Sequence, residues 1–224
     1  MNLRFSLPAA VLMLLASHMA LAADYAVAPL MQGPPDGVSA EISKLLAPAG
    51  LKITGGNRAV CEIWLLKEWP AKEGFQPSTS ILYPFEMGEL MGVIRFPRKA
   101  GDFRGQEIPS GVYTLRYALQ PEDGNHVGTS ETRDFLLMLP AAADTTAKRL
   151  DKDALFKLSK EAAETTHPAM LSLLPAKGEA GSMPAMEHDE ARELWSVRVA
   201  GKAAAAGKTS EQMIQLVVVG KAAE

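Results

Sequence analysis

Soft metal ligands and carboxylates gather in two short segments of the second half of the chain. Residues 183–190 read MPAMEHDE, and residues 167–170, a little upstream, read HPAM. Imidazole nitrogen and thioether sulfur together suit copper, above all Cu(I), in a compartment where thiolates are scarce. One imidazole is too few for such a site, so the two segments would have to meet in the folded protein.

The predicted metal site combines His167 and His188, with Met186 or His126 as a further ligand. All three histidines lie in segments predicted as loops, outside the alternating apolar pattern that surrounds a core histidine. The chain has 11 methionines, which are scattered rather than clustered, so chance alone can place one beside a histidine. Copper is therefore the one cofactor that the sequence suggests, and a charged, solvated loop is the alternative that it favours.

The chain lacks the short motifs that carry the common catalytic mechanisms. It has no Gly-x-Ser-x-Gly elbow, no His-Glu-x-x-His pair, no phosphate-binding loop and no dinucleotide-binding fingerprint. Because any two of its 26 acidic side chains can meet in a folded chain, a carboxylate-based envelope hydrolase stays open as an alternative. We favour a protein that is not an enzyme and that binds a small ligand or an envelope protein.

Aromatic residues next to prolines form a third group with chemical potential. Trp69 lies in KEWP, and Tyr83 and Phe85 flank Pro84. Exposed in loops, these rings would make a platform for a sugar or a peptide, and the sugar is the carbohydrate-binding alternative. Buried, they would close an open end of the core, and we prefer this second interpretation because large side chains often do so.

The first two dozen residues have the pattern of a signal peptide. Arg4 precedes an apolar run from Leu7 to Leu21, and residues 20–22 show the small-x-small pattern that signal peptidase cleaves. The run is short and interrupted, unlike a membrane-spanning helix. We expect residues 1–23 to be removed and residues 24–224 to form a single domain, periplasmic or secreted, with no membrane span.

Charge and cysteine content narrow the range of partners. With 23 basic and 26 acidic residues the net charge is −3, whereas nucleic-acid binding needs a strongly basic surface. Nucleic acid is therefore excluded as a partner.

Cys61 is the only cysteine, which leaves no intrachain disulfide, and its apolar surroundings in AVCEIWLL predict a buried, unreactive thiol.

Short apolar segments bounded by Gly, Pro, Asn or Asp predict strands through most of the chain. In the clearest one, residues 112–119, an apolar face alternates with a face that carries Arg116. A strand with one solvent-exposed face is typical of an antiparallel sheet. The apolar face, which we expect to point inward, consists of Tyr113, Leu115, Tyr117 and Leu119.

One amphipathic helix is expected near residues 145–164, where apolar residues recur every three or four positions. Asp144 or Thr145 would cap its start. A shorter helix is expected around residues 38–46. Runs of strands with one or two peripheral helices predict a mainly β fold, an antiparallel β-sandwich.

The residues around the clearest strand also carry a resemblance. The stretch EIPSGVYTLRYALQPEDGNH resembles the Pro-x-Gly-x-Tyr-x-Leu strand start of secreted bacterial β-sandwich domains, both transthyretin-like accessory domains and uncharacterised families. It covers 20 of the 224 residues. The resemblance implies a β-sandwich fold, and it implies no catalytic residue.

Overall fold

The structure, a computed structural model, describes residues 25–122, 130–178 and 183–222. The predicted signal peptide and His126 lie outside these residues. The long strands, in chain order, are β1 (Tyr25–Leu30), β2 (Gly50–Gly55), β3 (Arg58–Leu65), β5 (Leu90–Phe96), β8 (Gly111–Leu119), β9 (Asp134–Pro140), β10 (Met170–Leu174), β11 (Ala185–Asp189), β12 (Leu194–Ala205) and β13 (Lys208–Val219). The remaining elements are β4 (Trp69–Pro70), β6 (Ala100–Gly101), β7 (Glu107–Ile108), α1 (Ala40–Ser43) and α2 (Lys152–Ala163).

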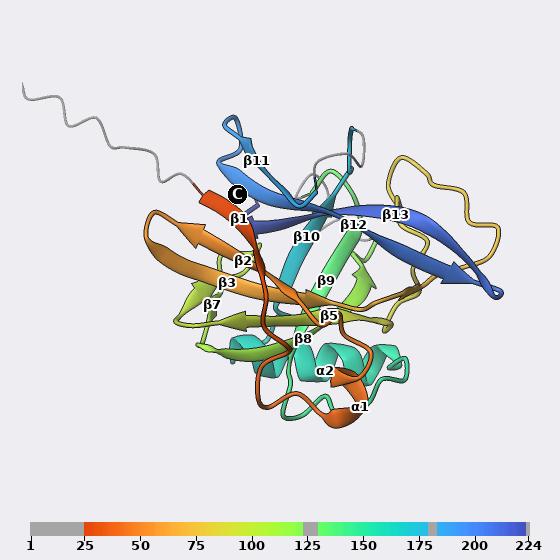
Figure 1. Cartoon of the computed structure of the whole chain (residues 1–224), viewed down its shortest axis with the longest axis horizontal. Helices are drawn as coiled ribbons and strands as arrows, with labels where there is room; N and C mark the ends of the chain where they lie inside the picture. The colour runs from red at the N-terminus through yellow and green to blue at the C-terminus, as the bar shows by residue number, and fades with distance from the viewer. Residues whose placement is uncertain (1–24, 123–129, 179–182, 223–224) are drawn as a thin grey trace, which may run out of the picture.

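The long strands follow one antiparallel hydrogen-bonded path in the order β1-β2-β3-β5-β8-β9-β10-β13-β12-β11. The short β4 pairs with β12, and β6 pairs with β7. In Figure 1 the sheet curls, with β11, β12 and β13 at the upper end of the view and α2 at the lower end. The two edge strands of the path, β1 and β11, approach each other. The ring of Tyr25, the first residue of β1, lies 5.1 Å from that of Trp195 on β12, the strand that pairs with β11.

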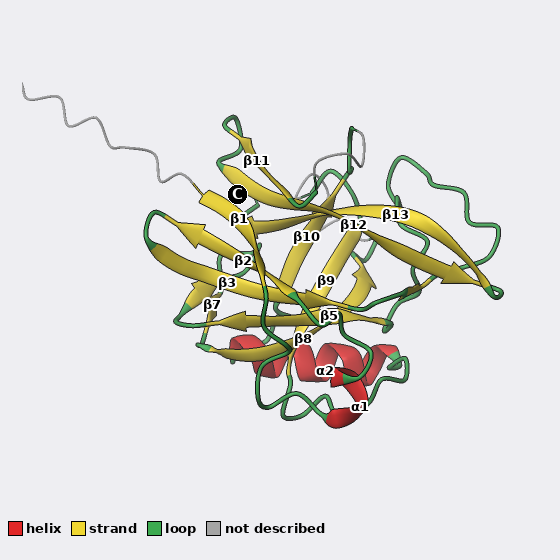
Figure 2. Cartoon of the chain, in the orientation of Figure 1, coloured by secondary structure: helices red, strands yellow, loops and turns green. Residues whose placement is uncertain are grey.

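The curl lets the two arms of the sheet share one core. Apolar side chains of β2, β3, β5 and β8 belong to the same buried cluster as side chains of β12 and β13. The predicted mainly β fold with one or two helices is confirmed, and Figure 2 shows both helices at one end of the strands. The two separate sheets of a sandwich are not distinguished, because the strands form one continuous path. Among the described residues, no helix is long and apolar enough to cross a membrane.

Strand β8 is buried on both faces. Tyr113, Leu115 and Tyr117 are 6%, 0% and 0% exposed, as predicted, and Leu119 at the strand end is half-buried. The prediction that the other face of this strand is solvent-exposed is wrong, because Arg116 is also 0% exposed. The chain that follows β9 covers this face, and its Asp144 carboxylate accepts hydrogen bonds from Arg116 Nε (2.6 Å) and Nη2 (2.8 Å).

All five N–H donors of Arg116 have acceptors. Besides the two bonds to Asp144, the guanidinium donates to the backbone oxygens of Gly88, Thr146 and Lys148. A charge so completely paired can be buried without leaving an unsatisfied group. The pair fixes the chain around residues 144–148 to β8.

This pair also corrects the predicted start of the long helix. Asp144 is engaged by Arg116, so it does not cap a helix, and α2 begins at Lys152 rather than near residue 145. Asp151 is the N-cap, and its side chain accepts a hydrogen bond from the N–H of Ala154 (2.9 Å). Helix α2 packs Leu155 against apolar side chains of β8 and β9.

Candidate ligand-binding site

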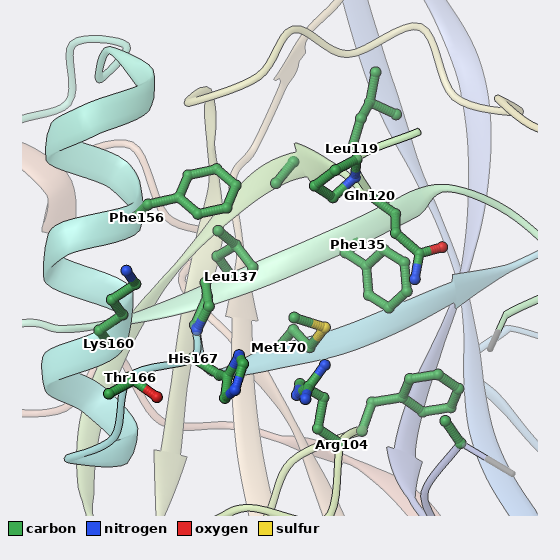
Figure 3. Close-up of a pocket in the computed structure, with 15 residues that line it drawn as sticks. Arg104, Leu119, Gln120, Phe135, Leu137, Phe156, Lys160, Thr166, His167 and Met170 are labelled. Carbon is green, nitrogen blue, oxygen red and sulfur yellow. The ribbon is translucent and has the colours of Figure 1, made fainter. Parts of the chain in front are cut away.

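A cavity of about 380 Å³ lies between α2, the C-terminal end of β8, the N-terminal half of β9, and the segment before β10. Its walls are mostly apolar (Figure 3), and they include the side chains of Phe103, Phe135, Leu137, Phe156 and Met170. Small-molecule sites in proteins have volumes of about 300–1,000 Å³ and are lined in this way, with a few polar groups. The cavity therefore has the size and lining of a site for a small molecule.

The titratable side chains that line the cavity are basic. Arg104, Lys160 and His167 are exposed residues that line it, and in Figure 3 they stand along one side of the apolar walls. Among the described residues that line the cavity there is no Asp or Glu. In the described part of the chain, no carboxylate forms an ion pair with the side chain of Arg104 or Lys160, and both of these exposed residues line the cavity.

Helix α2 and the turn after it position one half of the site. Phe156 and Lys160 are four residues apart and therefore share one helix face. The helix ends at Glu164, whose φ of 54° is left-handed, and the N–H of Thr165 donates to the oxygen of Lys160. The Thr165 hydroxyl then accepts a hydrogen bond of 3.1 Å from the N–H of His167, which holds that residue at the rim.

The buried carboxylate of Asp102 holds the other half in place. It accepts hydrogen bonds from the backbone N–H of Arg104 (2.9 Å), Gln106 (2.8 Å) and Met170 (3.1 Å). The Gln106 side-chain amide donates to both Asp102 and the oxygen of Pro168. Burial raises the pKa of Asp102, and the hydrogen bonds that it accepts oppose this rise. The loop with Arg104 is thus tied to the segment that leads into β10.

The structure places the predicted copper ligands in two separate regions. His167 and Met170 line the cavity beside α2, whereas His188 and Met186 lie on β11. Strands β13 and β12 stand between β10 and β11 in the sheet, and β11 and α2 lie at opposite ends of Figure 1. His126 is outside the described residues. The described residues contain no group of three or more His, Cys, Asp or Glu that could hold a metal, and the copper site stays a prediction.

His188 packs against an aromatic ring of the neighbouring strand. The segment predicted as a loop is the edge strand β11, and the His188 ring stacks on that of Trp195 with a centroid distance of 4.1 Å and an angle of 7°. Trp195 also contacts Tyr25 of β1, so these rings pack where the two ends of the curled sheet approach each other. Met186 is half-buried and packs against the main core.

The aromatic residues beside prolines do not form an exposed platform. Trp69, Tyr83 and Phe85 are 1%, 2% and 1% exposed. Their rings pack on one another, with centroid distances of 6.0 Å for Trp69 and Phe85 and 5.9 Å for Tyr83 and Phe85. The interpretation that they close the core is confirmed, and a sugar platform at these residues is excluded by their burial.

Comparison with known proteins leaves the cavity as the main guide to function. No family model, no curated protein and no solved structure matches this chain. The resemblance to transthyretin-like domains therefore stays a prediction.

Proposed function

We propose that this protein is an exported, non-catalytic binding module of the cell envelope, and that it holds a small, largely apolar ligand in the cavity beside α2. The observation that carries the proposal is the cavity itself, in which Phe103, Phe135 and Phe156 surround a volume of about 380 Å³. Burying an apolar ligand against such rings is favourable at roughly 25 cal/mol per Å² of apolar surface removed from water.

The positions of the acidic residues favour binding over hydrolysis. Glycoside hydrolysis by carboxylates needs two of them facing the bond that is cleaved, and the described lining of this cavity has none. Three of the buried acids, Asp102, Asp134 and Asp144, each accept several hydrogen bonds from the protein. Their hydrogen-bonding capacity is used in holding loops together.

Export is part of the proposal and rests on the leader pattern in residues 1–23. Mass spectrometry of the protein from the envelope fraction should give a chain that begins at Ala23 or Asp24. Intact Met1 in the cytoplasmic fraction would argue against it.

We also interpret the curled sheet as a sandwich-like arrangement, because the β12–β13 arm and the β2–β8 arm bury their side chains in one shared core.

Binding is tested with a neutral apolar probe, decan-1-ol, titrated calorimetrically into the mature chain. Phe156→Ala removes a ring from the cavity wall and should weaken binding on the order of tenfold, which corresponds to about 1.4 kcal/mol. Leu158→Ala is the matched control, since Leu158 lies on the same helix, is half-buried and does not line the cavity. Equal affinity in both variants would place the probe elsewhere.

A further inference from the structure

We infer that the natural ligand is an anionic amphiphile, with an apolar chain and a carboxylate or phosphate head that Lys160 and Arg104 recognise. This inference rests on the proposed function, because it specifies the ligand of the same cavity. It adds the charge of the ligand and the direction in which the ligand lies.

The first observation is the sign of the charge at the opening. The whole chain has a net charge of −3, yet the cavity is lined by Lys160, Arg104 and His167, and by no acid among the described residues. A cleft lined by charges of one sign concentrates ions of the opposite sign. The planar guanidinium of Arg104 can bind a carboxylate or phosphate through two hydrogen bonds, and the Lys160 ammonium adds a point charge.

The second observation is the placement of these charges relative to the apolar walls. Lys160 comes from the helix and Arg104 from the loop held by Asp102, and in Figure 3 His167 lies between them. Phe156 and Leu137 lie further along the cavity in the same view. A ligand with its head between Lys160 and Arg104 would therefore lay its apolar chain against these side chains.

The third observation is a neighbouring hollow that is also basic. It is lined by Arg58, Arg98 and Lys99, with no acid among its described lining residues, although Lys99 pairs with Glu107 (2.6 Å) outside that lining. The chain runs directly from this hollow to the cavity, through residues 98–104 and again through residues 218–222. The basic surface thus continues outward from the proposed head-group end, which favours the approach of an anion.

A cationic or neutral head would gain less at this opening. An ammonium head would meet two like charges and no described carboxylate, and like charges at close range repel. A hydroxyl head could accept a hydrogen bond from Lys160 or Arg104 but would not neutralise their charge. The inferred order of affinity is therefore anion, then alcohol, then amine.

The test is a calorimetric titration of the mature chain with decanoate, decyl phosphate, decan-1-ol and decylamine. The chain length is shared, so the differences report the head group. Both anions should bind more tightly than the alcohol, on the order of tenfold at low ionic strength, and high salt should reduce this difference. The amine should bind most weakly.

Two double variants separate the charge effect from folding. Lys160→Gln with Arg104→Gln should lower the affinity for decanoate to about that for decan-1-ol, so that the preference for the anion is lost. Lys157→Gln with Lys148→Gln, which removes two exposed charges that do not line the cavity, should keep the preference for anions. Far-UV circular dichroism and the midpoint of thermal denaturation, compared with those of the unaltered chain, show that each variant is folded.

The outcomes distinguish the inference from the proposed function. If decan-1-ol binds as tightly as both anions, the inference is wrong and the apolar binding function stands. If none of the four compounds binds, the proposed function fails and the inference fails with it. If the preference for anions survives Lys160→Gln with Arg104→Gln, the head group is recognised by other residues and the assignment is overturned.

Discussion

The carboxylate of Asp102 accepts a hydrogen bond of 3.1 Å from the backbone N–H of Met170, which lies 68 residues further along the chain. The same carboxylate accepts from the backbone of Arg104, so one buried group joins both the basic rim and the apolar wall of the cavity. The shape of the proposed site thus depends on a residue that does not line it.

Replacing Asp102 with Ala should destabilise the protein by about 2–4 kcal/mol, because it leaves buried N–H groups without acceptors. Asp102→Asn keeps one of the two oxygen acceptors and should cost less. The measurement is chemical denaturation, with Asp36→Ala on the exposed surface as the control. A loss below about 0.5 kcal/mol for Asp102→Ala would show that the carboxylate does not hold the loop.

Breaking the buried pair of Arg116 and Asp144 should be costly. Asp144→Asn leaves the guanidinium of Arg116, which is 0% exposed, without its counter-charge, and we expect a loss of about 3–5 kcal/mol. Glu107→Gln breaks the exposed pair with Lys99 and should change stability by at most about 1 kcal/mol. Similar losses in the two variants would mean that burial of the first pair does not have the expected effect.

Leu115 on β8 is 0% exposed and belongs to the main core, so Leu115→Ala should cost about 2–5 kcal/mol. Leu45→Ala, at a residue that is 43% exposed, is the matched control and should cost far less. Urea denaturation monitored by tryptophan fluorescence gives both values. Equal losses would be incompatible with the core described here.

The thiol of Cys61 should be unreactive in the folded protein. Cys61 is 0% exposed, and burial, with a smaller effect from Glu62, raises the pKa of its thiol far above the ordinary value. Because the thiolate is the reactive form, a thiol reagent should modify Cys61 only after unfolding. Rapid stoichiometric labelling of the native chain would contradict its burial in β3.

The β8 strand shows what the sequence could reveal and what it could not. Alternation in residues 112–119 correctly predicted that Tyr113, Leu115 and Tyr117 face the core, since local pattern reports one apolar face. The same pattern placed Arg116 in water. Only the tertiary fold shows that the chain around Asp144 returns to cover Arg116. For the same reason α2 begins at Lys152, later than the sequence predicted.

The candidate site was largely hidden from sequence reasoning for a similar reason. Phe156 and Lys160 share a helix face, a spacing that the sequence displays, but nothing local indicates that the Arg104 loop packs beside them. Of the predicted metal ligands, His167 does line the cavity, while His188 lies on an edge strand whose polar composition resembles that of a loop. Long-range hydrogen bonds, such as the one that the Met170 N–H donates to Asp102, bring these side chains together.

The most direct test of the central claim is to map where an apolar ligand binds. NMR chemical-shift mapping of the isotope-labelled mature chain with decanoate reports the location independently of the affinity. The account predicts that the largest shifts fall on Leu137, Phe156 and Met170 around the cavity, with small shifts on the far strand β11. Large shifts confined to β11 and β12, or no shifts at saturating ligand, would contradict it.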